Sequence, residues 1–267
     1  GAGDGTGDAS LAEKLAEKLV LNPNGQTSVV SKEFEVLYGS SVKVVETLVE
    51  NMTCDPENGT VEVALLTAND LASSFVFTNT RANTSITISK KVENGLTSDA
   101  THQFEFYAYY TDHGVKTYVT ANGTSTTETV IKVVPGTDFV SGAVLPVGVQ
   151  VTVEEINVPN GMSPSFDSSK ITLSETAAAN KVTCTNTRGV IKVTVEKKFG
   201  TLILDEDKAN TYTVEVTIDG VPYTVVLEPA TYSVVIENIP YGAAISNVVE
   251  TTELYDNFKT PVYGYSK

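Results

Sequence analysis

Three polar residues of this chain occupy positions where strand alternation predicts apolar ones. Successive side chains of a strand point to opposite faces, so a residue shares its face with those two and four positions before it. By that rule Lys90, Glu155 and Asn186 each share a face with apolar or thiol side chains. An isolated charge on such a face would be very costly. These companions are, in that order, Ile86 and Ile88; Val149, Val151 and Val153; Val182 and Cys184.

An amine, a carboxyl and a carboxamide on the apolar side of a domain can react with one another. Burial favours the neutral forms of lysine and glutamate. The neutral amine is a nucleophile, and the carboxylic acid can polarise the asparagine carbonyl and shuttle protons. The adjacent Lys91 and Glu154 are the outward-facing alternatives, and a β-bulge would exchange the roles. A lysine at a strand end can also extend to water, and an asparagine in Thr-Asn-Thr-Arg can serve as a turn residue.

These residues recur because the chain repeats itself. The segment 75–81, Phe-Val-Phe-Thr-Asn-Thr-Arg, returns as Val-Thr-Cys-Thr-Asn-Thr-Arg at 182–188, a shift of 107 residues. The lysine pair at 90–91 returns at 197–198 with the same shift. Turns that end in Gly39, Gly148 and Gly242 each lead into a strand that closes with glutamate. These glutamates are Glu46, Glu155 and Glu250.

The repeat predicts three modules, over residues 1–81, 82–188 and 189–267. Only the central module has a complete set of candidate groups. The first has Glu46 and Asn79 but no lysine-bearing strand of matching pattern before them. The last has Lys197 and Glu250, but only 17 residues follow that glutamate, where the earlier modules need 33 and 31 to reach their asparagine. We therefore expect the two outer modules to be incomplete sandwiches.

Incomplete sandwiches expose strand edges, and a strand from a neighbouring subunit can cover them. Two segments are candidate donors. Residues 18–22 end in Asn22 and imitate a final strand, and residues 263–267 end in Lys267 and imitate a lysine-bearing first strand. Both residues are candidates for contacts between subunits, and head-to-tail donation of this kind would build a filament.

The elements that must position these residues are strands. Residues 104–110 alternate Phe, Phe, Ala and Tyr on one face with Glu, Tyr and Tyr on the other, and Asn-Gly and Pro-Gly turns separate such stretches. This pattern predicts an all-β fold of tandem Ig-like antiparallel β-sandwiches. Residues 10–19 differ, since leucines at 11, 15 and 19 predict a short amphipathic helix.

The Lys–Glu–Asn pattern resembles the Gram-positive surface-protein modules of the collagen-adhesin B type, found in sortase-assembled pilins and adhesin stalks. The matching residues are Lys90 in Ile-Ser-Lys, Glu155 in Val-Glu-Glu and Asn186 in Thr-Asn-Thr. The resemblance implies an intramolecular isopeptide bond between Lys90 and Asn186, promoted by Glu155 with loss of ammonia. It extends in part to the outer modules, through their lysine, glutamates and asparagine. The chain lacks a Leu-Pro-x-Thr-Gly sorting signal and a Tyr-Pro-Lys pilin motif, which favours two alternatives over sortase linkage: strand donation, or a chain that is a fragment of a longer array of modules.

Composition excludes several classes of function. Eighteen basic against 33 acidic residues give a net charge of −15, which repels nucleic acid and anionic lipid, and no apolar run is long enough to insert into a membrane. Two cysteines and two histidines form no zinc-spaced cluster, and no cofactor motif stands out. Cys54 and Cys184 fall at non-equivalent places of the repeat, which favours two unpaired thiols over a disulfide.

We therefore predict an extracellular structural protein on a bacterial cell surface, a pilin or filament subunit or an adhesin stalk. Its partners would be copies of itself in a head-to-tail filament. It would not be an enzyme, since the only reaction predicted is self-modification without turnover. The alternative is an adhesin module that binds a host surface protein or glycan.

Overall fold

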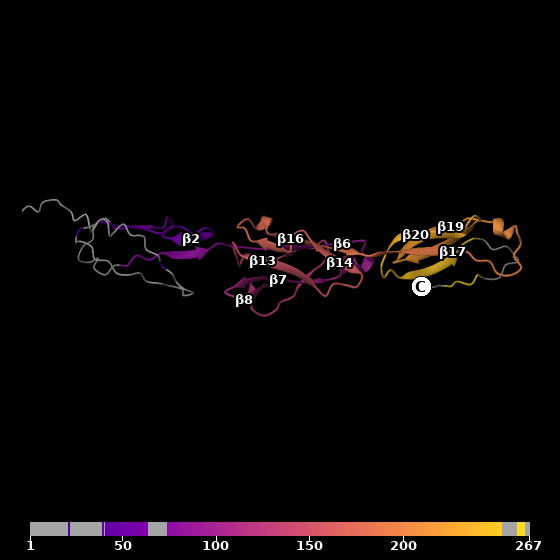
Figure 1. Ribbon diagram of the computed structural model, residues 1–267, viewed down its shortest axis with the longest axis horizontal. Helices are drawn as coiled ribbons and strands as arrows, with labels where there is room; N and C mark the ends of the chain where they lie inside the picture. The colour runs from indigo at the N-terminus through magenta and orange to yellow at the C-terminus, as the bar shows by residue number, and fades with distance from the viewer. Residues whose placement is uncertain (1–20, 22–38, 40, 64–73, 253–260, 265–267) are drawn as a thin grey trace, which may run out of the picture. The chain divides into compact units, whose positions relative to one another are not determined.

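The computed structural model describes residues 21, 39, 41–63, 74–252 and 261–264 (Figure 1). The predicted helix at 10–19, Asn22 and Lys267 lie outside these described residues. By compactness the chain divides into two units, residues 1–47 with 54–78, and residues 48–53 with 79–267. The division into three modules stays a prediction.

The first unit contains a small antiparallel sheet. Strand β1 (Val42–Val45) pairs with β3 (Thr60–Val63), with Val44 opposite Val61. Glu46 follows β1 directly, at the end of an alternating strand as the sequence predicted. The boundary between the two units falls within β2 (Met52–Asp55) and at β4 (Thr78–Arg81).

The second unit begins with a β-sandwich that carries the central candidate residues (Figure 1). One sheet has the order β15-β13-β7-β8-β9, and β10 also pairs with β7. Its strands are β7 (Phe104–Asp112), β8 (Val115–Val119), β9 (Thr124–Ser125), β10 (Ile131–Val133), β13 (Gln150–Ile156) and β15 (Lys170–Thr172). The other sheet has the order β11-β6-β16-β14. Its strands are β6 (Thr87–Glu93), β11 (Phe139–Val140), β14 (Met162–Phe166) and β16 (Lys181–Arg188).

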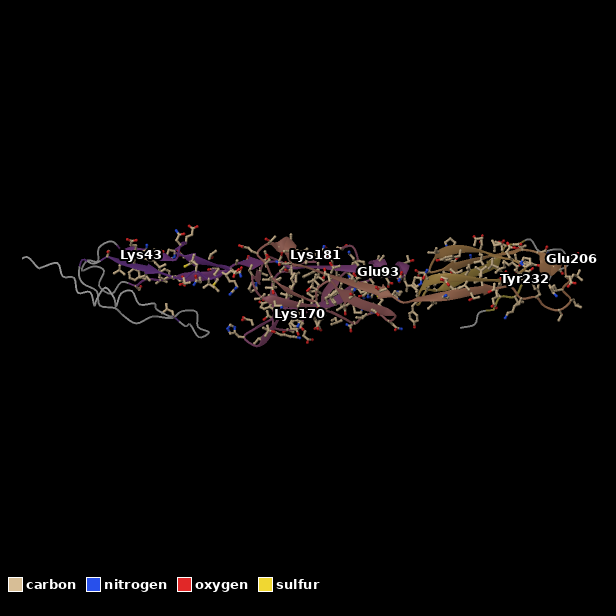
Figure 2. The ribbon with its side chains drawn as sticks, turned by 45° about the horizontal axis from the view of Figure 1, so that its top comes forward. Lys43, Glu93, Lys170, Lys181, Glu206 and Tyr232 are labelled. Carbon is tan, nitrogen blue, oxygen red and sulfur yellow. The ribbon has the colours of Figure 1, made fainter. Side chains whose placement is uncertain are left out.

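Alternating side chains from both sheets form one core. Ile88 of β6 and Val182 of β16 pack in the same buried cluster as Phe106 of β7 and Val153 of β13. The opposite faces are polar, and Figure 2 labels Lys181 and Glu93 among the exposed side chains. Strands β5 (Asn83–Thr84) and β12 (Leu145–Pro146) pair beside this sandwich. The predicted all-β sandwich fold is confirmed.

One pairing differs from the antiparallel arrangement predicted for the sandwich. Strands β6 and β16 run parallel, with Lys90 opposite Cys184 and Val92 opposite Asn186. They are adjacent because the chain crosses between the sheets before β16 closes the second sheet. A parallel pair needs such a long crossover rather than a hairpin. It also brings the lysine and asparagine to the same end of the sheet.

A second core follows within the same unit. Strands β17 (Val190–Glu196) and β20 (Ser233–Pro240) pair with each other, and β19 (Val221–Leu227), β18 (Tyr212–Ile218) and β21 (Ile245–Glu250) form the facing sheet. The buried cluster includes Val214, Val216, Leu227 and Ile239. Three short 3-10 helices, η2 (Thr97–Thr101), η3 (Ala177–Ala179) and η4 (Asp207–Ala209), lie in connecting segments.

The arginines that end the two Thr-Asn-Thr-Arg segments make the same hydrogen bond. Arg81 donates from Nη1 to the carbonyl of Val147 at 3.0 Å, and Arg188 donates from Nη1 to that of Tyr241 at 3.2 Å. Each acceptor is the middle residue of a Pro-x-Gly turn. Arg188 is also buried in a two-pronged ion pair with Asp99, at 2.8 and 2.7 Å. The repeated sequence motifs therefore meet each other at the joints between strand groups.

The backbone repeats this scheme. Gly189 donates to the carbonyl of Gly161 at 2.9 Å and accepts from Tyr241 at 2.8 Å. Gly161 has a φ of +79°, and a Cβ at that position would overlap the Tyr241 ring, so glycine is required there. At the other joint Ala82 donates to Asn51 and accepts from Val147, both at 2.9 Å.

Candidate functional site

Glu155 of β13 holds the two other central candidates, one on each carboxylate oxygen. Its Oε2 lies 2.8 Å from Nζ of Lys90, and its Oε1 accepts a hydrogen bond from Nδ2 of Asn186 at 2.8 Å. The Lys90 and Glu155 side chains are 0 % and 1 % exposed, and Asn186 is 0 % exposed. The structure thus brings together the three residues selected by strand parity.

The surroundings of this cluster are apolar. Nζ of Lys90 lies 4.4 Å from the ring centre of Phe104 and 5.4 Å from that of Phe106. Nδ2 of Asn186 lies 3.6 Å from Sδ of Met162. Apolar walls exclude water, which strengthens the interactions among the three polar groups.

The outward alternatives do not enter the cluster. Lys91 is exposed, and Glu154 lies on the opposite face of β13, where it stands across from Tyr107 of β7. The described backbone has no irregularity between β6, β13 and their neighbours that would exchange these roles.

Cys184 is a fourth member of the cluster that sequence reasoning assigned only to the core. Its thiol donates to Oε2 of Glu155 at 3.1 Å and accepts from Nζ of Lys90 at 3.2 Å. Burial, followed by the hydrogen bond to Glu155, raises the pKa of the thiol to about 12. It is therefore a neutral donor. Its place two residues before Asn186 on the same face was the available signal.

The C-terminal candidates form a similar pair. Nζ of Lys197 lies 2.7 Å from Oε2 of Glu250, and the two side chains are 16 % and 4 % exposed. Nζ also lies 4.4 Å from the ring centre of Tyr212. The other oxygen of Glu250, Oε1, is buried and has no hydrogen-bond partner among the residues that the structure describes.

In the first unit a thiol again contacts the motif glutamate. Cys54 donates to Oε2 of Glu46 at 2.9 Å, and this hydrogen bond, with lesser contributions from burial and nearby carboxylates, raises the pKa of the thiol to about 11. Asn79 lies in β4, in the other compact unit. Both cysteines are unpaired, which confirms the expectation of two free thiols.

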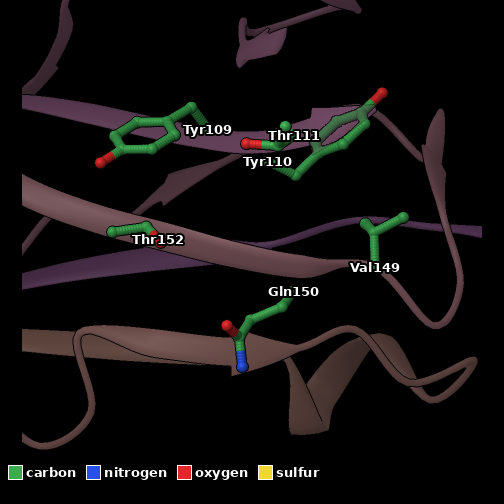
Figure 3. A pocket seen from close by; sticks show the side chains of 6 residues that line it. All are labelled: Tyr109, Tyr110, Thr111, Val149, Gln150 and Thr152. Atoms are coloured by element: carbon green, nitrogen blue, oxygen red, sulfur yellow. The ribbon is translucent and has the colours of Figure 1, made fainter. Parts of the chain in front are cut away.

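A shallow hollow lies beside β7 and β13, away from the buried cluster (Figure 3). Hydroxyl, carboxamide and apolar side chains line it, among them Tyr109, Gln150 and Thr152. Within the described ranges no group of histidines, cysteines and carboxylates could hold a metal ion. Across those same ranges no helix is long and apolar enough to cross a membrane.

Comparison with known proteins gives matches among solved structures. The chain is similar to two major pilins of Streptococcus pyogenes, each at 17 % identity. The first match covers 57 % of this chain and 69 % of the pilin, with a TM-score of 0.35. The second match covers 59 % of this chain and 70 % of the pilin, with a TM-score of 0.37. It is also similar to a single B repeat unit of the collagen-binding surface protein CNA of Staphylococcus aureus, at 16 % identity, covering 64 % of this chain and 87 % of that unit with a TM-score of 0.24. No family model matches the sequence, and no curated protein does.

Proposed function

We propose that this chain is a structural subunit of a bacterial surface fibre, a pilin or an adhesin stalk, whose central module is closed by an amide bond between Lys90 and Asn186. One observation carries the proposal: Glu155 binds both side chains through separate oxygens, and all three are buried. As such a subunit the protein would act outside the cell, with copies of itself as partners, and would catalyse no turnover.

The contacts supply a balanced route to the bond. A proton passes from Nζ of Lys90 to Oε2 of Glu155 across their 2.8 Å contact, which leaves a neutral amine. The amine attacks Cγ of Asn186, the new N–C bond forms, and the bond from Cγ to Nδ2 breaks. The departing nitrogen receives the two protons that the lysine ammonium loses, by way of Glu155, and leaves as ammonium. Oε1 already contacts that nitrogen, so the carboxyl spans the donor and the leaving group.

The bond would have a mechanical role. Lys90 lies in β6 and Asn186 in β16, the neighbouring parallel strands by which the chain enters and leaves the sandwich. An amide between them ties these strands covalently, so a pulling force could not separate them. Repeated modules then supply length.

Intact mass under denaturing conditions tests the proposal. The mass should fall below the sequence mass by one ammonia per bond, and a peptide map should join the peptides of Lys90 and Asn186. Glu155→Ala should abolish that joined peptide, whereas the matched control Glu154→Ala on the opposite face should keep it. Unjoined peptides in a folded wild-type protein would disprove the bond.

A second candidate function, binding of a host glycan, has one supporting observation. The ring centre of Tyr118 lies 5.5 Å from that of Tyr107 and 5.7 Å from that of Tyr109. Nζ of Lys116 lies 3.8 Å from the Tyr109 ring centre. Tyrosine is enriched at binding interfaces, where its ring packs and its hydroxyl can stay in water. A glycan array with wild-type protein and Tyr109→Ala separates the two functions, since a stalk alone should bind no glycan.

A further inference from the structure

The carbonyl oxygen of Asn186, Oδ1, is the atom on which negative charge develops when the Lys90 amine attacks Cγ. In a site without water, that charge is stabilised by a hydrogen-bond donor that is already in place. Glu155 does not supply the donor, because its Oε1 accepts a hydrogen bond from Nδ2 of the same carboxamide at 2.8 Å. The donor must therefore come from another side chain.

The thiol of Cys184 is in position to donate to this oxygen. Its Sγ lies 3.6 Å from Oδ1 of Asn186, within reach of a sulfur hydrogen bond. The carboxamide is oriented for this contact, since an ionised carboxylate only accepts and Nδ2 must face Glu155. Among the residues that the structure describes, no other donor contacts Oδ1.

Strand pairing fixes the position of the thiol. Cys184 lies two residues before Asn186 on the same face of β16, and the parallel register places it directly opposite Lys90 of β6. The residue is 0 % exposed. Its Sγ lies 3.2 Å from Nζ of Lys90 and 3.1 Å from Oε2 of Glu155. The thiol therefore contacts both reacting side chains and the carboxyl between them.

The single hydrogen of the thiol can change its acceptor as the reaction proceeds. In the structure the nearer acceptor is Oε2 of Glu155, at 3.1 Å against 3.6 Å for Oδ1 of Asn186. Once Oε2 has taken a proton from Lys90 it carries a hydrogen itself and accepts less well, while negative charge grows on Oδ1. The sulfur keeps its proton throughout, and no bond to sulfur forms or breaks. Burial raises the pKa of the Cys184 thiol to about 12, which agrees with a neutral donor at physiological pH.

We propose that Cys184 is a catalytic residue of the bond-forming step, whose thiol donates a hydrogen bond to Oδ1 of Asn186 as negative charge develops there. This role rests on the proposed amide bond between Lys90 and Asn186. The corresponding position of the first module, 107 residues earlier, is Phe77, which has no donor. The repeat itself therefore does not require a thiol at this position.

The rate of bond formation in the full chain tests this role. The chain is made by brief cell-free synthesis, translation is stopped, and timed samples are placed in denaturant so that intact mass gives the joined fraction. Loss of an oxyanion donor slows a reaction by about 10²–10³-fold, and a thiol is a weaker donor, so Cys184→Ala should slow the bond by about tenfold or more. Cys184→Val, which fills the space without a donor, should be as slow. Cys184→Ser, which restores a donor, should be faster than both.

Folding is measured separately, by adding each change to Asn186→Ala, in which the central bond cannot form. Urea unfolding followed by circular dichroism should show each double variant folded before urea is added. A rate for Cys184→Ala or Cys184→Val equal to that of the wild type would overturn the role of the thiol alone. So would a folded Cys184→Ser that is no faster than Cys184→Ala, or slow rates confined to variants that are unfolded in the Asn186→Ala background. A wild-type chain that never loses ammonia would overturn both this role and the proposed function.

Discussion

Replacing Asn186 by alanine should prevent the central bond, so that Lys90 and Glu155 stay as the ion pair seen in the structure. The bond closes a loop of roughly 100 residues, which in the chain-entropy model is worth about 4.7 kcal/mol of stability. For a domain of about 100 residues, a loss of about 4.7 kcal/mol lowers the unfolding temperature by roughly 20 °C or more.

Asn180 provides the matched control for this change. It is also 0 % exposed, and its carboxamide makes four hydrogen bonds, to Ser174, Thr84 and Ser85, yet it lies outside the cluster around Glu155. Asn180→Ala should therefore destabilise the module by about 1–3 kcal/mol through unsatisfied partners and keep the ammonia-deficient mass.

Differential scanning calorimetry on the three proteins, with their masses measured in parallel, makes the comparison. Asn186→Ala should show the full mass for this module and much the larger drop in unfolding temperature. The loop-closure reasoning is refuted if Asn186→Ala has the full mass but its unfolding temperature equals or exceeds that of Asn180→Ala. A wild-type protein without the bond would refute it as well.

The remaining predictions concern the thiols and the joint. Because their pKa values are raised to about 12 and about 11, Cys184 and Cys54 in the folded protein should react with iodoacetamide at pH 8 far more slowly than a free thiol, and the rates should rise as pH approaches those values. Equal rates in folded and unfolded protein would contradict this. Arg188→Ala should cost about 3–5 kcal/mol by leaving Asp99 buried and unpaired, measured by urea unfolding, and Asp99→Asn should cost less. Gly161→Ala should increase proteolysis at the Arg188–Gly189 joint, since a Cβ there collides with a ring and strains a left-handed backbone.

Strand parity was enough to predict the central cluster from sequence. It depends only on the two-residue period of a strand and on the cost of burying a charge, and both hold for Lys90, Glu155 and Asn186 wherever their strands lie in the fold. The repeat supplied Lys197 and Glu250 by the same rule. Local pattern therefore selected which side chains point inward.

Pairing between distant strands could not be predicted in the same way. The parallel alignment of β6 with β16 depends on how the chain crosses between sheets over almost the whole module, and alternation carries no information on direction. For the same reason the sequence placed Cys184 on the core face but not between Lys90 and Glu155. The contact of the Cys54 thiol with Glu46 also depends on tertiary placement. A turn separates the two residues, so strand alternation could not predict that their side chains meet.

The order of the elements decides how the proposed bond would carry load. Tension on the chain enters the central sandwich at the start of β6 and leaves at the end of β16, where Arg188 and Gly189 lead directly into β17. With Lys90 joined to Asn186, the covalent path passes from β6 through the amide into β16, and the strands between them, β7 to β15, carry none of the force. Because Asn186 lies two residues before Arg188, the load passes from the bond almost directly to the joint held by Asp99, Asn160 and Tyr241. The noncovalent joint, and not the bonded sandwich, is then the mechanically weaker element, so stretching should extend the chain at the joint before the central module unfolds.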